Sequence, residues 1–208
     1  MDFQGMTTVE AAKALLGKKL VLDHGWAVLS GYIVETEAYL GLEDQACHAF
    51  GGRFTPRTQA LYQAGGSLYI HLIHNHIQLN IVTRPEGVPE GVLIRGIEPA
   101  EGMEVMALNR GRQGFELTNG PGKLTQAFGI TKALYGLTLG DCPLSIDEEG
   151  SKTPRSILSS GRIGIPNKGE WTSAPLRFYV AGNPYVSRMP KREMTAPEDS
   201  WSAACCTS

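Results

Sequence analysis

Residues 19–39 constrain the fold more than any other stretch, because they predict two strands joined by a tight turn. The segments 19–23 and 26–39 are rich in strand-forming residues, and the letters "DHG" between them are a turn signal. Further strands are predicted in "SLYIHLIHNHIQLNIVT", as a hairpin around Asn75, in "EGVLIRGIEP", and in the segment that follows "GRIGIP". Mostly consecutive strands with short connections favour an antiparallel sheet.

Helices are predicted between these strands. In "TVEAAKALLGKKL" Thr8 is the expected cap and Gly17 the stop, and two more helices are expected in "EPAEGMEVMALNRG" and after "LTNGPG". The 25 glycines and 12 prolines are spread along the chain, as in a fold with many turns. We therefore expect an α+β fold with one compact domain over residues 1–190. The small, polar C-terminal end predicts a disordered tail over 191–208.

Composition excludes several classes of protein. The 208 residues carry 19 Lys and Arg against 21 Asp and Glu, a net charge of −2, which argues against non-specific coating of nucleic acid. No apolar run approaches the roughly 20 residues that cross a bilayer, and no export signal precedes the first helix. The four cysteines form no C-x-x-C pair, so a disulfide framework and a zinc knuckle are not expected. These features predict a cytoplasmic protein without a membrane partner, associated with the nucleoid if its source is bacterial.

The stretch "VETEAYLG", residues 34–41, carries the strongest local chemistry. On a strand, Glu35, Glu37 and Tyr39 share one face. A carboxylate beside an aromatic ring in a cleft suits a general base that activates water. The alternative is an amphipathic edge strand whose acids lie in solvent.

The next stretch, "CHAFGGRFTPR", is a glycine-rich loop with His48, Arg53 and Arg57. Two arginines beside adjacent glycines can hold a phosphate through side chains and backbone N–H groups, so Arg53 and Arg57 are candidate phosphate contacts. The alternative is an ordinary solvated loop.

The stretch "YIHLIHNHIQLN" contains three of the five histidines and raises the question of a metal site. On an extended strand His71 faces away from His74, and a turn at Asn75 breaks the register between His74 and His76. No H-E-x-x-H spacing and no carboxylate occur within the run. No metal is therefore predicted, and a metal hydrolase that uses these histidines is kept only as a hypothesis to be tested against the readings given below.

Taken in order, several segments resemble the 3-methyladenine (alkyladenine) DNA glycosylases. The resemblance rests on "IVETEAYLG" with "HAFGGRFTPR" downstream, then "GSLYIHLI", "GVLIRGIEP", "NGPGKLTQAFGI" and "PLRFYVAGNPYVS", over roughly residues 8–188. It implies a curved, mostly antiparallel sheet with surrounding helices and a β-hairpin that inserts into DNA. It also implies a monomer that binds double-stranded DNA containing damaged purines and needs no cofactor.

The resemblance also implies roles for single residues. Glu37 matches the general base that activates water for attack on the sugar, and Arg95 matches an arginine near the target phosphate and this carboxylate. Tyr39 matches an aromatic that stacks on the flipped base. His48 matches a histidine that hydrogen-bonds the base edge, and Asn80 matches an asparagine that disfavours the exocyclic amine of guanine.

The chain departs from the family pattern in its hairpin. His71 stands where a stacking Tyr is usual, and His74 where the intercalating Tyr is expected, in a hairpin one residue shorter. We therefore assign His71 to the base pocket, and expect the wedge that fills the vacated base stack to be His74, Asn75 or His76.

These assignments predict a monofunctional glycosylase that releases alkylated purines, such as 3-methyladenine and 7-methylguanine, and deaminated or ethenylated ones. The altered hairpin leaves one alternative, a non-catalytic binder of alkylated or distorted DNA that uses the same pocket.

Overall fold

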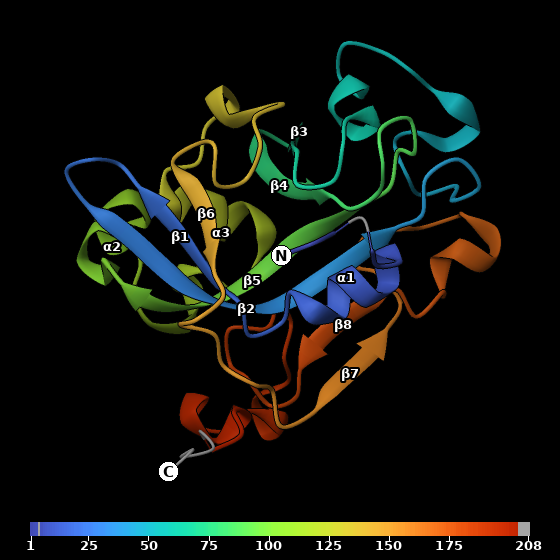
Figure 1. Ribbon diagram of the computed structural model, residues 1–208. Helices are drawn as coiled ribbons and strands as arrows, with labels where there is room; N and C mark the ends of the chain where they lie inside the picture. The colour runs from blue at the N-terminus through green and yellow to red at the C-terminus, as the bar shows by residue number, and fades with distance from the viewer. Residues whose placement is uncertain (4, 204–208) are drawn as a thin grey trace.

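Eight strands form one curved sheet in the computed structural model, which describes residues 1–3 and 5–203 (Figure 1). The sheet has the order β3-β4-β5-β2-β1-β6, and the β7–β8 hairpin joins it through β8, which pairs with β2. Every named pairing is antiparallel, which confirms the predicted α+β class and mostly antiparallel sheet. The strands are β1 (Lys19–Asp23), β2 (Val28–Tyr39), β3 (Leu68–Ile73), β4 (His76–Val82), β5 (Gly91–Glu101), β6 (Leu144–Asp147), β7 (Ile157–Ser160) and β8 (Arg177–Val180).

Strands β2 and β5 form the centre of the sheet, and their pairing contains three irregularities, of which the two near the site compensate each other and the third lies at Ala100. Val34 is an extra residue on β2 between two paired positions, and Arg95 is an extra residue on β5 directly beyond it. A bulge of this kind bends its strand and re-aims one side chain. The bulge at Arg95 therefore changes where this arginine points.

Helix α1 (Thr8–Ala14) covers one face of the sheet. Its N-cap is Thr7, which exchanges hydrogen bonds with Glu10 in a capping box, so the prediction of Thr8 as the cap is wrong. The Thr8 hydroxyl is instead buried against Thr83 and Glu90, residues that the sequence pattern does not link to it. The Thr36 hydroxyl donates to the carbonyl of α1 residue Ala12 at 2.8 Å, so the even-numbered side of β2 faces α1.

Helices α2 (Met103–Arg110) and α3 (Pro121–Phe128) pack against each other, and α3 contacts β4 and β5. Pro121 stands in the first helical turn of α3, where its missing N–H costs no intrahelical bond. Short 3-10 helices occupy several connections: η1 (Phe50–Gly52), η2 (Gln59–Tyr62), η3 (Gly114–Leu117), η4 (Lys132–Leu134), η5 (Gly169–Thr172), η6 (Lys191–Glu193) and η7 (Pro197–Ser200).

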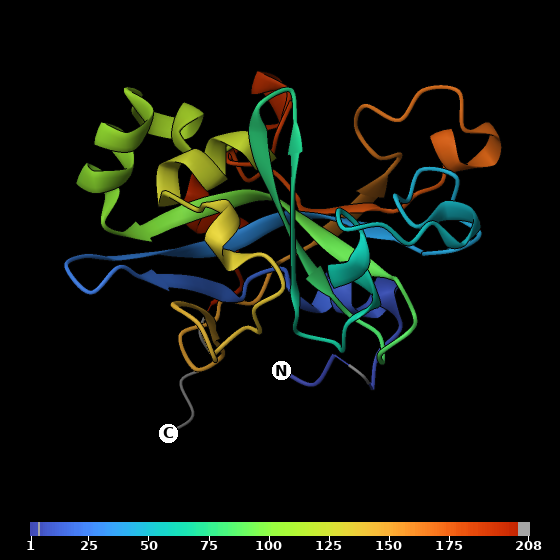
Figure 2. The ribbon, with the colours of Figure 1, turned by 90° about the horizontal axis from the view of Figure 1, so that it is seen from above.

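The β3–β4 hairpin turns through His74 and Asn75, which confirms the hairpin predicted around Asn75. Both residues have positive φ angles, 47° and 64°, as a two-residue type I′ turn requires. Figure 2 shows the hairpin rising from the sheet on the side away from α1. A Cβ atom on Gly122 of α3 would lie 2.7 Å from the Cβ of His76, so a glycine lets the helix approach the hairpin closely.

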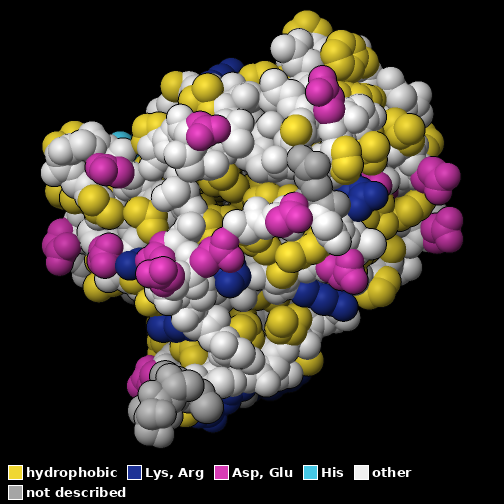
Figure 3. All heavy atoms as spheres, viewed as in Figure 1, with side chains coloured by type: hydrophobic (Ala, Val, Ile, Leu, Met, Phe, Trp, Pro, Cys, Tyr) yellow, Lys and Arg dark blue, Asp and Glu magenta, His cyan; other side chains and the backbone are white. Residues whose placement is uncertain are grey.

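The surface on the α1 side carries charges of both signs. In Figure 3 Asp and Glu side chains are scattered over this face among a smaller number of Lys and Arg side chains. Among residues 1–3 and 5–203, no helix has the length and apolarity needed to cross a membrane.

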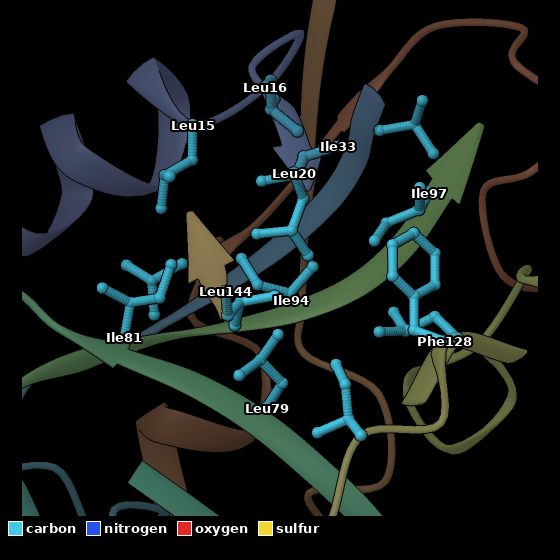
Figure 4. Close-up of a cluster of buried hydrophobic side chains, with 14 of the residues drawn as sticks. Leu15, Leu16, Leu20, Ile33, Leu79, Ile81, Ile94, Ile97, Phe128 and Leu144 are labelled. Carbon is cyan, nitrogen blue, oxygen red and sulfur yellow. The ribbon is translucent and has the colours of Figure 1, made fainter. Parts of the chain in front are cut away.

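The hydrophobic core contains side chains of the sheet, of α1 and of α3. Figure 4 shows Leu15 and Leu16 above the sheet, with Phe128 of α3 beside Ile97 of β5. Most side chains of β2 and β5 are buried, because helices or loops cover both faces of these central strands.

The C-terminal segment differs from the disordered tail predicted over 191–208. Trp201 is 5% exposed, and its indole N–H donates to both carboxylate oxygens of Glu98, at 3.0 and 3.2 Å. The Lys152 ammonium lies 5.2 Å from the Trp201 ring and donates to Glu98 at 2.8 Å. A buried aromatic that also satisfies a buried carboxylate fixes this segment, so the prediction is wrong up to this tryptophan. Residues 204–208 of the predicted tail lie outside the described residues.

Candidate active site

A row of side chains crosses the sheet on the face opposite α1. Tyr69 of β3 pairs with Asn80 of β4, and Asn80 pairs with Leu93 of β5. Leu93 pairs with Glu37 of β2, which pairs with Arg177 of β8. Directly opposed residues of antiparallel strands point to the same face. The register of five strands therefore places these side chains in one row on the same face, although the residues are far apart in the sequence.

The bulge in β5 turns Arg95 toward two carboxylates on this face. Its Nε lies 3.0 Å from Oε1 of Glu35, and its Nη1 lies 3.2 Å from Oε1 of Glu37. Arg95 is 6% exposed, and both glutamates are fully buried. The shared guanidinium offsets the repulsion between two acids on one strand face. The alternative of an edge strand with its acids in solvent is wrong, since β2 lies inside the sheet.

The Glu37 carboxylate is held by two further donors. The backbone N–H of Ile163 donates to Oε1 at 2.7 Å, and the Tyr39 hydroxyl donates to Oε2 at 2.9 Å. Burial raises the pKa of Tyr39 well above its usual value, and the charge of Glu37 acts in the same direction. The phenol therefore stays protonated and remains a donor to the carboxylate.

Glu35 has a different and more crowded environment. Its Oε1 accepts from Nε of Arg177 at 2.6 Å and from the Ser187 hydroxyl at 2.7 Å, in addition to Arg95. Its Oε2 accepts from the Ser187 backbone N–H at 2.7 Å. Glu35 thus ties β5, β8 and the segment around Ser187 to β2. Sequence reasoning assigned no role to Arg177 or Ser187, although both stand in the family-like segment "PLRFYVAGNPYVS".

A buried ion pair supports the Tyr39 side of the site. The guanidinium of Arg162 contacts both carboxylate oxygens of Asp44, and both side chains are fully buried. The same guanidinium lies 4.6 Å from the centre of the Tyr39 ring and donates to the Ala38 carbonyl. Arg162 also precedes Ile163, the residue whose N–H donates to Glu37. The sequence shows this arginine in "GRIGIP", but nothing there identifies its partners.

A pocket opens beside these groups and brings together all four residues assigned to base binding: Tyr39, His48, His71 and Asn80. Its volume is about 500 Å³ with its mouth included, and the rest of its lining is mostly apolar, with Cys47, Leu61, Leu93 and Ile165 among it. Small-molecule sites commonly have this balance of many apolar and a few polar groups. Tyr39 is the residue that both lines this pocket and contacts Glu37.

Hydrogen bonds fix the two pocket histidines. Nδ1 of His48 lies 2.8 Å from the Tyr69 hydroxyl, and Nδ1 of His71 lies 3.3 Å from Nδ2 of Asn80. Burial, with the charges of Arg57 and Arg53, lowers the pKa of His48 to about 4. Burial, with His48 and Arg57, lowers the pKa of His71 to about 3. Both imidazoles are therefore neutral at physiological pH.

The structure separates His71 from the other two histidines of the run. His74 lies in the exposed turn of the hairpin, and His76 packs against α3 at Gly122, beside a shallow depression that Asn75 also lines. Within the described part of the chain, no three His, Cys, Asp or Glu side chains form a group that could hold a metal ion. The three candidate wedge residues therefore lie at the hairpin end, while His71 lies in the pocket.

The two arginines of the glycine-rich loop are exposed, as a solvated loop would also have them. Arg57 lines a second depression next to the base pocket, together with Lys132, Tyr135 and His71. This depression carries two cationic side chains and no acid. Arg53 does not line it, although its charge, like that of Arg57, acts on His48 of the base pocket.

Comparisons with known proteins identify a family and several relatives of this chain. A family model described as methylpurine-DNA glycosylase (MPG) matches residues 2–184. A Staphylococcus epidermidis protein is 57% identical over 201 residues, which are 97% of this chain and 98% of that protein. Proteins of Staphylococcus haemolyticus and Staphylococcus aureus are 55% and 54% identical, each over 97% of this chain and 100% of the relative. All three carry the provisional name 3-methyladenine DNA glycosylase.

Proposed function

The chain belongs to the methylpurine-DNA glycosylase family, and on this premise we propose that it is a monofunctional DNA glycosylase for damaged purines. Its substrates are duplexes with alkylated purines such as 3-methyladenine and 7-methylguanine, or with deaminated or ethenylated purines. It hydrolyses the N-glycosidic bond, releases the base and leaves an abasic site for base excision repair.

One observation carries the proposal: a fully buried carboxylate, Glu37, borders a pocket lined by aromatic side chains through its contact with Tyr39. A base inside a duplex cannot be reached, so the nucleotide must rotate out of the helix and enter such a pocket. Cleavage then develops positive charge on the sugar, which a nearby carboxylate stabilises while it orients the attacking water. The Tyr39 contact on Oε2 must open, or be bridged by this water, when the nucleotide is bound.

The pocket favours a cationic base for a physical reason. Alkylation at N3 or N7 gives the purine a positive charge, which is attracted to the face of an aromatic ring by about 1–2 kcal/mol. Tyr39 supplies such a ring, and the two neutral histidines add no opposing charge. The same charge makes the alkylated base a good leaving group.

DNA approaches, in this proposal, on the side of the hairpin. The hairpin rises away from the α1 face, which carries scattered acids, and Arg57 and Lys132 lie beside the pocket mouth. The residues His74, Asn75 and His76 fill the gap that the flipped base leaves, while Arg53 and Arg57 contact phosphates. The protein acts as a monomer in the cytoplasm and uses no metal or organic cofactor.

A second function is favoured by the closed environment of Glu37. Because both of its oxygens already accept hydrogen bonds, the same pocket could bind alkylated or distorted DNA without cleaving it. Residue 74 is also a histidine, whose imidazole has a smaller stacking surface than the tyrosine ring expected there from the family resemblance.

The test is base release from duplexes that contain 3-methyladenine, 7-methylguanine, hypoxanthine or ethenoadenine, followed by alkaline cleavage at abasic sites. We expect Glu37→Gln to lower release by at least about 100-fold, the usual contribution of a general base, while lesion binding changes little. Glu101→Gln is the matched control, since Glu101 lies far from the pocket in an exposed contact with Lys19. Release at the wild-type rate by Glu37→Gln refutes the mechanism. Binding without release of any base by the wild-type protein supports the binder instead.

A further inference from the structure

The two ring nitrogens of His71 have unequal surroundings. Nδ1 faces the amide of Asn80, while the hydrogen bonds of the described residues include none to Nε2. His71 is 8% exposed and lines the base pocket, so most of the ring is packed and one edge remains open to a ligand. Whether this free Nε2 binds a hydrogen-bond acceptor or a donor of the ligand depends on whether it carries the proton of the ring.

The Asn80 amide fixes that protonation. Nδ2 of Asn80 lies 3.1 Å from the backbone carbonyl of Tyr69, which can only accept a hydrogen bond. The amide must therefore point its NH₂ group at this carbonyl, and its second hydrogen points at Nδ1 of His71. Nδ1 must accept, so the proton of the neutral imidazole is on Nε2.

The surroundings of the ring keep it in this neutral form. Tyr69 stacks on His71 with ring centres 5.0 Å apart, and the ring of His48 is nearly perpendicular to that of His71, with ring centres 4.6 Å apart. The charged group near it is the guanidinium of Arg57, whose positive charge opposes protonation. Tyr69 and His48 both contact the ring, and the part of His71 that the pocket leaves for a base includes its Nε2–H edge.

We propose that His71 is a specificity-determining residue that donates a hydrogen bond from Nε2–H to an acceptor atom of the flipped purine. The substrate class is purines that present an oxygen or an unsubstituted ring nitrogen at this edge, as the 6-oxopurine hypoxanthine does. A purine that presents an amino group there leaves two donors opposed and binds more weakly. The inference rests on the proposed function, because it assumes that a purine enters this pocket.

The test combines substitutions at one residue with deletions of single base atoms. His71→Gln keeps an N–H close to the position of Nε2, and His71→Phe keeps the ring but loses the donor. Binding is measured in the Glu37→Gln background with duplexes that contain hypoxanthine or its analogues without O6, N7 or N3. His24→Phe is the matched control, since His24 stacks on the exposed Trp26 in the β1–β2 turn, away from the pocket.

We expect one of the three atom deletions to weaken binding by about 5- to 100-fold when residue 71 is His or Gln, the cost of an unpaired buried donor. In the His71→Phe variant, which has no donor to lose, the same deletion should weaken binding by less than about 2-fold. If no deletion depends on residue 71, the inference is overturned.

The protonation of His71 can also be measured in the wild-type protein, so this second test does not depend on whether a substituted protein folds. The ¹⁵N chemical shifts of the His71 imidazole distinguish the two neutral forms, and a proton on Nδ1 or a charged ring at pH 7 overturns the inference. Failure of the proposed function looks different, since the wild-type protein would then release no base from duplexes with 3-methyladenine, 7-methylguanine, hypoxanthine or ethenoadenine.

Discussion

The same isosteric substitution, Glu to Gln, should affect different properties at the two glutamates of "VETEAY": folding stability at one and base release at the other. Glu35→Gln and Glu37→Gln each remove one negative charge from a fully buried site next to Arg95. We expect Glu35→Gln to impair folding and Glu37→Gln to impair base release with little effect on folding.

The difference follows from which partners can reverse their roles. An amide at position 37 can accept from Ile163 and Arg95 with its oxygen, and donate from its NH₂ group to the Tyr39 hydroxyl, which can become an acceptor. At position 35 the oxygen that faces Arg95 and Arg177 meets two obligatory donors.

The other oxygen of Glu35 meets a third obligatory donor, the backbone N–H of Ser187. Whichever way the side-chain amide of the Glu35→Gln variant turns, its NH₂ group faces a donor. Removing one partner of a buried ion pair costs about 3–5 kcal/mol. This cost is a large part of a typical total stability of about 5–15 kcal/mol. The cost at position 37 should stay below about 2 kcal/mol, because every hydrogen bond can be kept.

Urea denaturation followed by circular dichroism measures both effects, and thermal unfolding should show a fall of about 6–20 °C in Tm for Glu35→Gln. Equal losses of stability at positions 35 and 37 would refute the argument that partner chemistry separates the two acids. A Glu35→Gln protein as stable as the wild type would refute the assignment of Glu35 as a structural residue.

Two further predictions concern the tail and the pocket histidines. Trp201→Ala should lower the free energy of unfolding by about 3–5 kcal/mol, and Trp26→Ala, at a ring that is 73% exposed, by less than about 1 kcal/mol in the same urea titration. Base release at a temperature where the Trp201→Ala protein is folded should be unchanged, and lost release would contradict a purely structural role. Because the pKa of His71 is about 3 in the folded protein and 6.5 when unperturbed, its contribution to stability is complete above pH 6.5 and is lost as pH falls toward 3. The loss reaches about 2 kcal/mol at about pH 5, so unfolding titrations should show a smaller pH dependence for His71→Phe, and identical pH dependence would contradict the buried neutral ring.

Much of the fold follows from local sequence patterns. Alternation along 28–39 placed Glu35, Glu37 and Tyr39 on one face and Thr36 on the other, and the structure confirms this through Arg95 and the α1 contact of Thr36. The turn at His74 and Asn75 was also predictable, because asparagine tolerates the positive φ angle of a tight hairpin. Such features depend only on residues that are close in the sequence and on the alternation of side chains between the two faces of a strand.

Other features of the site could not be predicted. Nothing local distinguishes Glu35 from Glu37, since the partners of Glu35 at Arg177 and Ser187 are 142 and 152 residues away along the chain. The Arg162–Asp44 pair spans 118 residues, and its position beside Tyr39 depends on the packing of a loop onto the sheet. Trp201 looked like part of a polar tail, because its partner Glu98 is 103 residues away.

Local patterns in the sequence were enough to predict most of the central strands, the three α-helices, the hairpin turn, the family and the candidate residues of the pocket, but not β6 or β7. The tertiary structure was needed to show that Glu37 is fully enclosed, that Arg95 bridges two acids, and that Nδ1 of His71 faces the Asn80 amide. The physical reason is register: two compensating bulges and the pairing of five strands set which donor meets which acceptor, and these pairings join residues that no local pattern links.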